Sequence, residues 1–108
     1  MAQTFKNAAQ VIGLSATDVY VCPPETTAVV IGAQATNLVG STLSLSVTWT
    51  DFSDGNAEYR LAQGVQVPEA AAYEPVGGKL VLEEGDRLRA QTSATNGVDL
   101  TVSVLELS

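Results

Sequence analysis

The sequence predicts an all-β protein that folds as a single antiparallel β-sandwich. Apolar residues recur at every second position in most of the chain, and no window has the spacing of an amphipathic helix. The clearest example is the run TLSLSVTWTDF, in which Leu43, Leu45, Val47 and Trp49 alternate with threonine and serine. A sheet with one apolar face cannot bury that face alone, so a second sheet must pack against it.

The alternation divides the chain into strands near residues 19–22, 27–37, 41–52, 56–63, 79–83, 86–94 and 98–107. About seven to eight strands in two sheets are typical of a β-sandwich, and a jelly roll is one candidate topology. Residues 1–16 show no clear pattern. We therefore expect an N-terminal arm over 1–16 that becomes ordered on a neighbour, followed by one β-sandwich domain over 17–108.

The same alternation predicts which side chains face the core. In the run AVVIGAQATN the odd-numbered positions are expected on the inner face, namely Val29, Ile31, Ala33 and Ala35. In the run VDLTVSVLEL the even-numbered positions are expected there, namely Val98, Leu100, Val102 and Val104.

Three connections are predicted to be three-residue hairpin loops that end in glycine, at residues 38–40, 53–55 and 95–97. A two-residue Asn96-Gly97 turn would put the apolar faces of its flanking strands on opposite sides, whereas a three-residue loop brings them together. Glycine suits the last loop position because that residue has a positive φ. The predicted pairs include Ala94 with Val98, Ala35 with Leu43, Val47 with Leu61, and Trp49 with Tyr59 as a cross-strand aromatic pair.

Charge and composition argue against several classes of protein. Twelve acidic residues against five basic ones give a net charge of −7, which opposes binding to nucleic acid or to an anionic membrane surface. We find neither a run of about 20 apolar residues nor the apolar segment of a signal peptide. The single cysteine, Cys22, cannot form an intrachain disulfide and is expected to be a small buried apolar residue.

The residues that usually carry chemistry are scarce. There is no histidine, which removes the usual general base and the commonest metal ligand, so we expect neither catalysis nor a cofactor. Asp51, Asp54, Asn56 and Glu58 could hold a calcium ion, but a hairpin loop with solvated charges is the favoured interpretation. A carboxylate pair of the glycosidase type also stays open, since nothing singles out two of the acids.

Several motifs resemble those of a family of small virion proteins of tailed bacteriophages. They are VYVCPPETTAVVIGAQATNL, VTWTD and GVQVPEAAAYEPVGGKLVLEEGDRLRAQTSATNGVDLTVSVLELS, within residues 18–108. The resemblance implies a non-catalytic component of the virion that is made in the host cytoplasm. It is compatible with a capsid decoration (cement) protein, commonly a trimer, that bridges major capsid protein subunits on the head exterior. It is equally compatible with a neck, collar or tail protein at the head–tail junction.

Under the decoration hypothesis two segments are expected to contact other proteins. They are the N-terminal arm, through Thr4, Phe5 and Lys6, and the long loop 64–78, through Val67, Pro68, Tyr73 and Pro75. Long loops are often functional, and an arm can add a strand to the sheet of a neighbour. Two other classes stay open: a carbohydrate- or receptor-binding module that uses exposed aromatic residues, and a calcium-loaded accessory domain of an enzyme.

Overall fold

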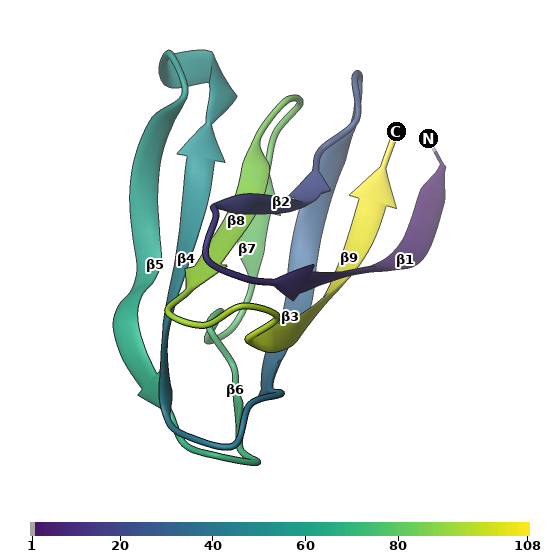
Figure 1. The fold of residues 1–108 in the computed structure, drawn as a ribbon. Helices are drawn as coiled ribbons and strands as arrows, with labels where there is room; N and C mark the ends of the chain where they lie inside the picture. Colours follow the sequence, from purple (N-terminus) through teal and green to yellow (C-terminus); the bar gives the residue numbers. More distant parts are fainter. Residues whose placement is uncertain (1) are drawn as a thin grey trace.

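The computed structural model describes residues 2–108, which form two antiparallel β-sheets packed face to face (Figure 1). The elements are β1 (Gln3–Ile12), β2 (Thr17–Val21), β3 (Thr27–Asn37), β4 (Leu43–Asp51), the 3₁₀ turn η1 (Phe52–Asp54), β5 (Ala57–Val67), β6 (Ala72–Tyr73), β7 (Leu80–Leu82), β8 (Arg87–Thr92) and β9 (Val98–Leu107). The predicted all-β sandwich is confirmed. Within residues 2–108, no helix has the length and apolar character that crossing a membrane requires.

The strand order is that of a jelly roll. One sheet has the order β1-β9-β3-β6, with β7 also paired to β3, and the other has the order β2-β8-β4-β5. The strands β6 and β7 pair with different parts of β3 along the same edge, so together they occupy one strand position. The chain thus passes repeatedly from one sheet to the other, as in a jelly roll of eight strands.

Two of the three predicted hairpins are wrong, because their connections cross between the sheets. The strands β3 and β4 lie in different sheets, and so do β8 and β9. Ala94 therefore does not pair with Val98, and Ala35 does not pair with Leu43. Strand β9 instead lies between β1 and β3, and Ala35 pairs with Leu100 on β9. Alternation identifies which face of a strand is buried, but it does not identify which strand lies beside it. Two strands can therefore have matching apolar faces in a predicted hairpin that does not form.

The third hairpin, between β4 and β5, is present. Trp49 pairs with Tyr59 as predicted, and their rings stack with centroids 5.3 Å apart. The turn contains η1 and ends with Gly55 at a φ of 65°. Farther along, the register shifts at a bulge, so Val47 pairs with Ala62 rather than with the predicted partner one residue earlier.

Gly97 serves a different purpose from the one predicted. It is absent from the glycines with positive φ, which include Gly55 and Gly85. A Cβ atom at Gly97 would lie 2.5 Å from Thr92 Oγ1 and 3.1 Å from the carbonyl oxygen of Ala94. The missing side chain therefore lets the crossover to β9 pass close to the end of β8.

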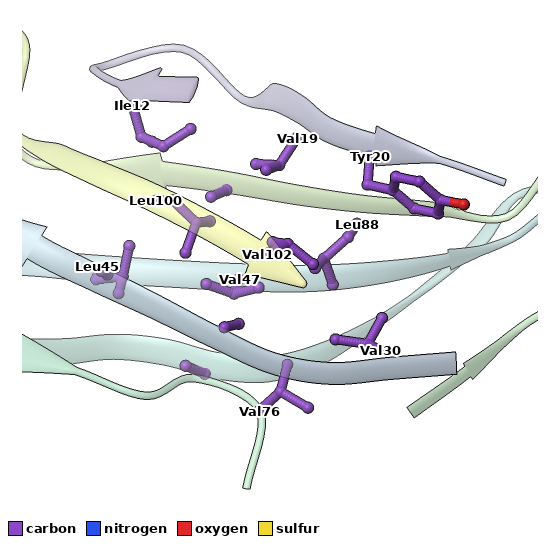
Figure 2. Close-up of a cluster of buried hydrophobic side chains, with 14 of the residues drawn as sticks. Ile12, Val19, Tyr20, Val30, Leu45, Val47, Val76, Leu88, Leu100 and Val102 are labelled. Atoms are coloured by element: carbon purple, nitrogen blue, oxygen red, sulfur yellow. The ribbon is translucent and has the colours of Figure 1, made fainter. Parts of the chain in front are cut away.

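The core lies between the two sheets and is mostly aliphatic. In Figure 2, Leu45, Val47 and Leu88 from one sheet point toward Val30 and Leu100 from the other, and all five are fully buried. The even-numbered positions of β9 are buried as predicted, and Cys22 is buried as well. The Cys22 thiol donates to the carbonyl of Thr26 at 3.3 Å, which satisfies its weak donor.

Residues 3–12, expected to form an arm, are paired with β9 along their whole length. The register runs without interruption from Gln3 opposite Leu107 to Ile12 opposite Val98. The core-facing side of β1 is largely polar, and only its last residue, Ile12, is buried. The apolar residues of β1 do not alternate with polar ones, as Ala8-Ala9 and Val11-Ile12 show, so the strand gives no period-two signal. The division of the chain near residue 16 stays a prediction.

We expect Gly97→Ala to lower the free energy of unfolding by about 1–3 kcal/mol, because the new methyl group overlaps Thr92. Urea denaturation of both proteins measures the change. The matched control is Gly40→Ala, since nothing lies within 4 Å of a Cβ atom there. Equal effects of the two substitutions would contradict this account of Gly97.

Candidate functional site

An apolar row crosses the outer face of the β1-β9-β3-β7 sheet. Phe5 lies opposite Leu105, Leu105 opposite Val29, and Val29 opposite Val81. These four side chains, the apolar row, alternate along their strands with residues that face the other sheet. Phe5 is 72% exposed and Val81 is 55% exposed. The row is therefore open to solvent at both ends.

More apolar surface adjoins the row. Ile31 is also exposed and lines, with Phe5, Asn7 and Ser103, a shallow hollow of about 220 Å³. Contiguous exposed apolar surface on a small soluble domain typically marks an interaction site. This face of the sheet is thus the candidate site for contact with another protein.

Sequence reasoning named Phe5 as a contact but placed Val29 of this row, and the adjoining Ile31, on the core-facing side. The register between β3 and β9 shifts between Val30 and Gly32, and this bulge changes which residues face inward. Val30 is fully buried, whereas Ile31 is exposed. The glycine at position 32 was the available signal, since a glycine inside a strand often marks a bulge.

The outer face of the other sheet is polar. It carries all three arginines, Arg60, Arg87 and Arg89. Asp18 lies 3.1 Å from Arg87 Nη1 and 2.7 Å from Arg89 Nε. A hollow of about 270 Å³ on this face is lined by Ser46, Thr48, Glu58, Arg60, Gln63 and Gln91, together with Ala16 and Ala90. An outer sheet face on which polar and charged side chains predominate is typically solvated.

The four sheet edges differ in how open they are to another strand. The edge strand β2 has five residues and a bulge, and β6 and β7 have two and three residues. The edge strand β5 has two register shifts and carries Glu58 and Arg60. Short strands, bulges and charges all hinder pairing with another chain. In contrast, β1 has ten residues, an unbroken register and one charged residue, Lys6.

The free backbone groups of β1 belong to its odd-numbered residues. Ala2 and Ser108 exchange two backbone hydrogen bonds, at 2.8 and 3.0 Å. In an antiparallel ladder such bonded pairs recur at every second residue, so the even-numbered residues bond to β9. The outward N–H and C=O groups are therefore those of Gln3, Phe5, Asn7, Ala9 and Val11.

A buried carboxylate anchors β1 to both sheets. Glu106, on the core side of β9, lies 3.0 Å from Lys6 Nζ on β1. The Tyr20 hydroxyl on β2 donates a 2.5 Å hydrogen bond to the same carboxylate. The hydrogen bond from Tyr20 and the nearby Lys6 charge hold the pKa of Glu106 below its ordinary value. Burial, together with the Glu106 carboxylate, raises the pKa of Tyr20 far above its ordinary value.

The structure separates the predicted contact residues: β1 and β6 are opposite edges of one sheet, whereas Val67 ends β5 in the other sheet. Thr4, Phe5 and Lys6 lie on β1, where Phe5 points outward and the other two lie on the inner side. Pro68 is exposed and Tyr73 is half-buried in β6. Val67 and Pro75 are buried, so neither is accessible to a partner in this conformation. Strands β9 and β3 separate β1 from β6.

Another buried carboxylate, Asp86, holds two segments of the chain together through hydrogen bonds. It accepts hydrogen bonds from the backbone N–H groups of Phe52 and Glu83, each at 2.9 Å, and from Trp49 Nε1 at 3.3 Å. These donors compensate the burial of the carboxylate and tie the turn before β8 to the end of β4. In the described part of the chain, no group of three or more Cys, Asp or Glu side chains is placed to hold a metal ion.

Comparison with known proteins finds solved structures whose fold is similar to that of this chain. No family model and no curated protein matches the sequence. Similar solved structures include the acidic stable capsid of Helicobacter pylori bacteriophage KHP30, with a TM-score of 0.58 and 12% identity over 100% of this chain and 94% of that chain. The disulfide-linked pili of Bacillus endospore appendages match with a TM-score of 0.57 and 11% identity, over 99% and 87% of the two chains. The T13 particle of IBDV matches with a TM-score of 0.58 and 12% identity, over 96% of this chain and 30% of that chain.

We expect Glu106→Gln to flatten the acid side of the stability profile. Because the folded-state pKa of Glu106 is lowered, its charge stabilises the fold above the ordinary glutamate pKa. That contribution is lost as the pH falls through the folded-state pKa. Urea denaturation between pH 7 and pH 3 should show a smaller loss of free energy in the variant. Glu74→Gln, which removes an exposed carboxylate, is the control, and equal losses in wild type and Glu106→Gln would contradict the assignment.

Proposed function

We propose that this chain is a non-catalytic capsid decoration (cement) protein of a tailed bacteriophage. It binds the outside of the head and stabilises contacts between major capsid protein subunits, acting as a homo-oligomer. The apolar row is the observation that carries this proposal. The similarity in fold to a phage capsid protein and to a viral particle protein supports it, as does the resemblance in motifs.

The apolar row has the character of the apolar centre of a protein contact. Neighbouring strands lie about 4.8 Å apart, so the row from Phe5 to Val81 is about 14 Å long. Covering a row of this length removes large apolar side chains from water, and such side chains dominate the centre of protein interfaces. The shell repeats its subunits, so the same modest contact is made many times on one particle.

The charge of the chain fits an external position. With a net charge of −7, the protein surface opposes contact with the packaged nucleic acid. The apolar row itself contains no charged residue, and residues 1–17 contain no Asp or Glu. The Phe5 end of the row therefore has no carboxylate in its own strand, whereas Glu83 follows Val81 by two residues at the other end.

Two alternatives differ from this proposal, the first in copy number and position on the particle and the second in the surface that it uses. A neck, collar or tail protein at the head–tail junction would use the same apolar row in far fewer copies. A carbohydrate- or receptor-binding module is favoured by the polar hollow beside Arg60 and Gln91, whose mixed donors and acceptors suit hydroxyl groups. Binding of glycans to this hollow, detected by perturbed amide signals of its lining residues, would favour the second alternative.

We expect the chain to be present in purified particles at close to one copy per major capsid protein subunit, because a cement protein occupies every equivalent joint. Quantitative mass spectrometry against the major capsid protein measures this ratio. A few copies per particle would move the protein to the neck or tail. Its absence from particles would overturn the proposed function.

We expect the double substitution of Phe5→Ser and Val81→Ser to lower the occupancy of particles by more than about tenfold, because it removes both exposed ends of the apolar row. Sedimentation of particles mixed with the purified protein measures the occupancy. Leu38→Ser is the matched control, since Leu38 is a similarly exposed apolar residue outside the row. Equal losses in the control and the double variant would exclude the row as the contact.

A further inference from the structure

We infer that β1 pairs in antiparallel fashion with β1 of a second copy of this chain, which makes the protein a two-fold symmetric dimer. The inference concerns the free edge of the sheet, whereas the capsid contact concerns its outer face. The dimer therefore does not depend on the proposed function, and purified protein suffices to test it.

Charge favours a second copy at this edge. Each chain carries a net charge of −7, so two copies repel each other over most orientations. Residues 1–17 contain no Asp or Glu and one lysine, Lys6. The β1 edge is thus the long strand edge along which two acidic copies can approach without bringing carboxylates together.

The free backbone groups determine the register of the pair. The outward groups belong to Gln3, Phe5, Asn7, Ala9 and Val11, a set that is symmetric about Asn7. With Asn7 on the two-fold axis, Gln3 pairs with Val11 of the second copy and Phe5 with its Ala9. All five residues then bond in each copy, which makes about ten hydrogen bonds, the number found in a typical interface. If the two β1 strands are shifted by two residues from this register, one outward-facing residue in each copy has no partner.

The side chains are compatible with this register. The large Phe5 side chain lies beside the small Ala9 of the second copy on the outer face. On the inner side, Lys6 lies opposite Ala8 of the second copy, and each Lys6 keeps its own Glu106 at 3.0 Å. No pair of like charges is placed directly opposite, which would oppose pairing.

The Glu106 anchor makes strand addition the favoured mode over strand exchange. Lys6 and Tyr20 hold β1 in its own sheet through one carboxylate. The edge is therefore presented in a fixed conformation, and little conformational entropy is lost when a second strand pairs with it. The result is one continuous sheet through both copies, with the two apolar rows on the same face.

Analytical ultracentrifugation of the full chain tests the dimer. We expect twice the chain mass, and we expect Asn7→Lys to raise the dissociation constant by more than about tenfold, because it places like charges across the axis. Gln34→Lys is the matched control, since it adds the same charge at an exposed position of β3 in the same sheet. A monomer, the trimer implied by the resemblance, or a dimer unaffected by Asn7→Lys would overturn the inference.

A second variant separates the edge from any effect on folding. The N–H group of Ala9 points away from β9, so Ala9→Pro removes no hydrogen bond within the chain. We expect Ala9→Pro to be a monomer with an unchanged circular dichroism spectrum. A folded Ala9→Pro protein that remains a dimer would show that β1 does not form the interface.

Cross-linking tests the register. Asn7→Cys places two thiols across the axis at a Cα separation of about 5.5 Å, which a disulfide can span. We expect mild oxidation to yield a covalent dimer of Asn7→Cys and none of Gln34→Cys, while the native Cys22 stays buried. A dimer that fails to cross-link through Cys at position 7 would overturn the proposed pairing about Asn7.

Discussion

The burial of two apolar sheet faces against each other is the constraint on which the rest of this structure depends. Strand β9 illustrates it, because Val98, Leu100, Val102 and Val104 are all fully buried while β9 pairs with β1 on one side and β3 on the other. The side chains of β4 and β8 face them across the core. Transfer of this aliphatic surface out of water is the main contribution that stabilises such a domain.

Winding the chain between two sheets leaves four edges and two outer faces, and these differ in chemistry. One outer face carries the ion pairs of Asp18 with Arg87 and Arg89, and the other carries the apolar row. The edge strands β2 and β5 are protected by bulges and charges, whereas β1 is not. The unprotected β1 edge and the apolar row are adjacent, because Phe5 belongs to both. This concentration of open surface on one sheet is why both the proposed capsid contact and the proposed dimer involve β1.

Glu106 links the fold to this surface. Its carboxylate, on the core side of β9, is bonded by Tyr20 from the opposite sheet and by Lys6 from β1. A charged group so placed is stabilised only while both partners are present, because an unpaired buried charge is costly. The three residues therefore hold the polar strand β1 in a sheet to which its side chains contribute little apolar burial.

Local pattern in the sequence determined the all-β class, the two-sheet architecture, the buried faces of β4 and β9, and the pairing of Trp49 with Tyr59. These follow from period-two alternation and a short loop, which act between residues close in the chain. Only the tertiary structure decided that β3 and β4, and likewise β8 and β9, lie in different sheets, that a bulge turns Val29 outward, and that residues 3–12 form an edge strand. The pairing of distant strands depends on how both sheets pack as a whole, and alternation within one strand does not encode its neighbour.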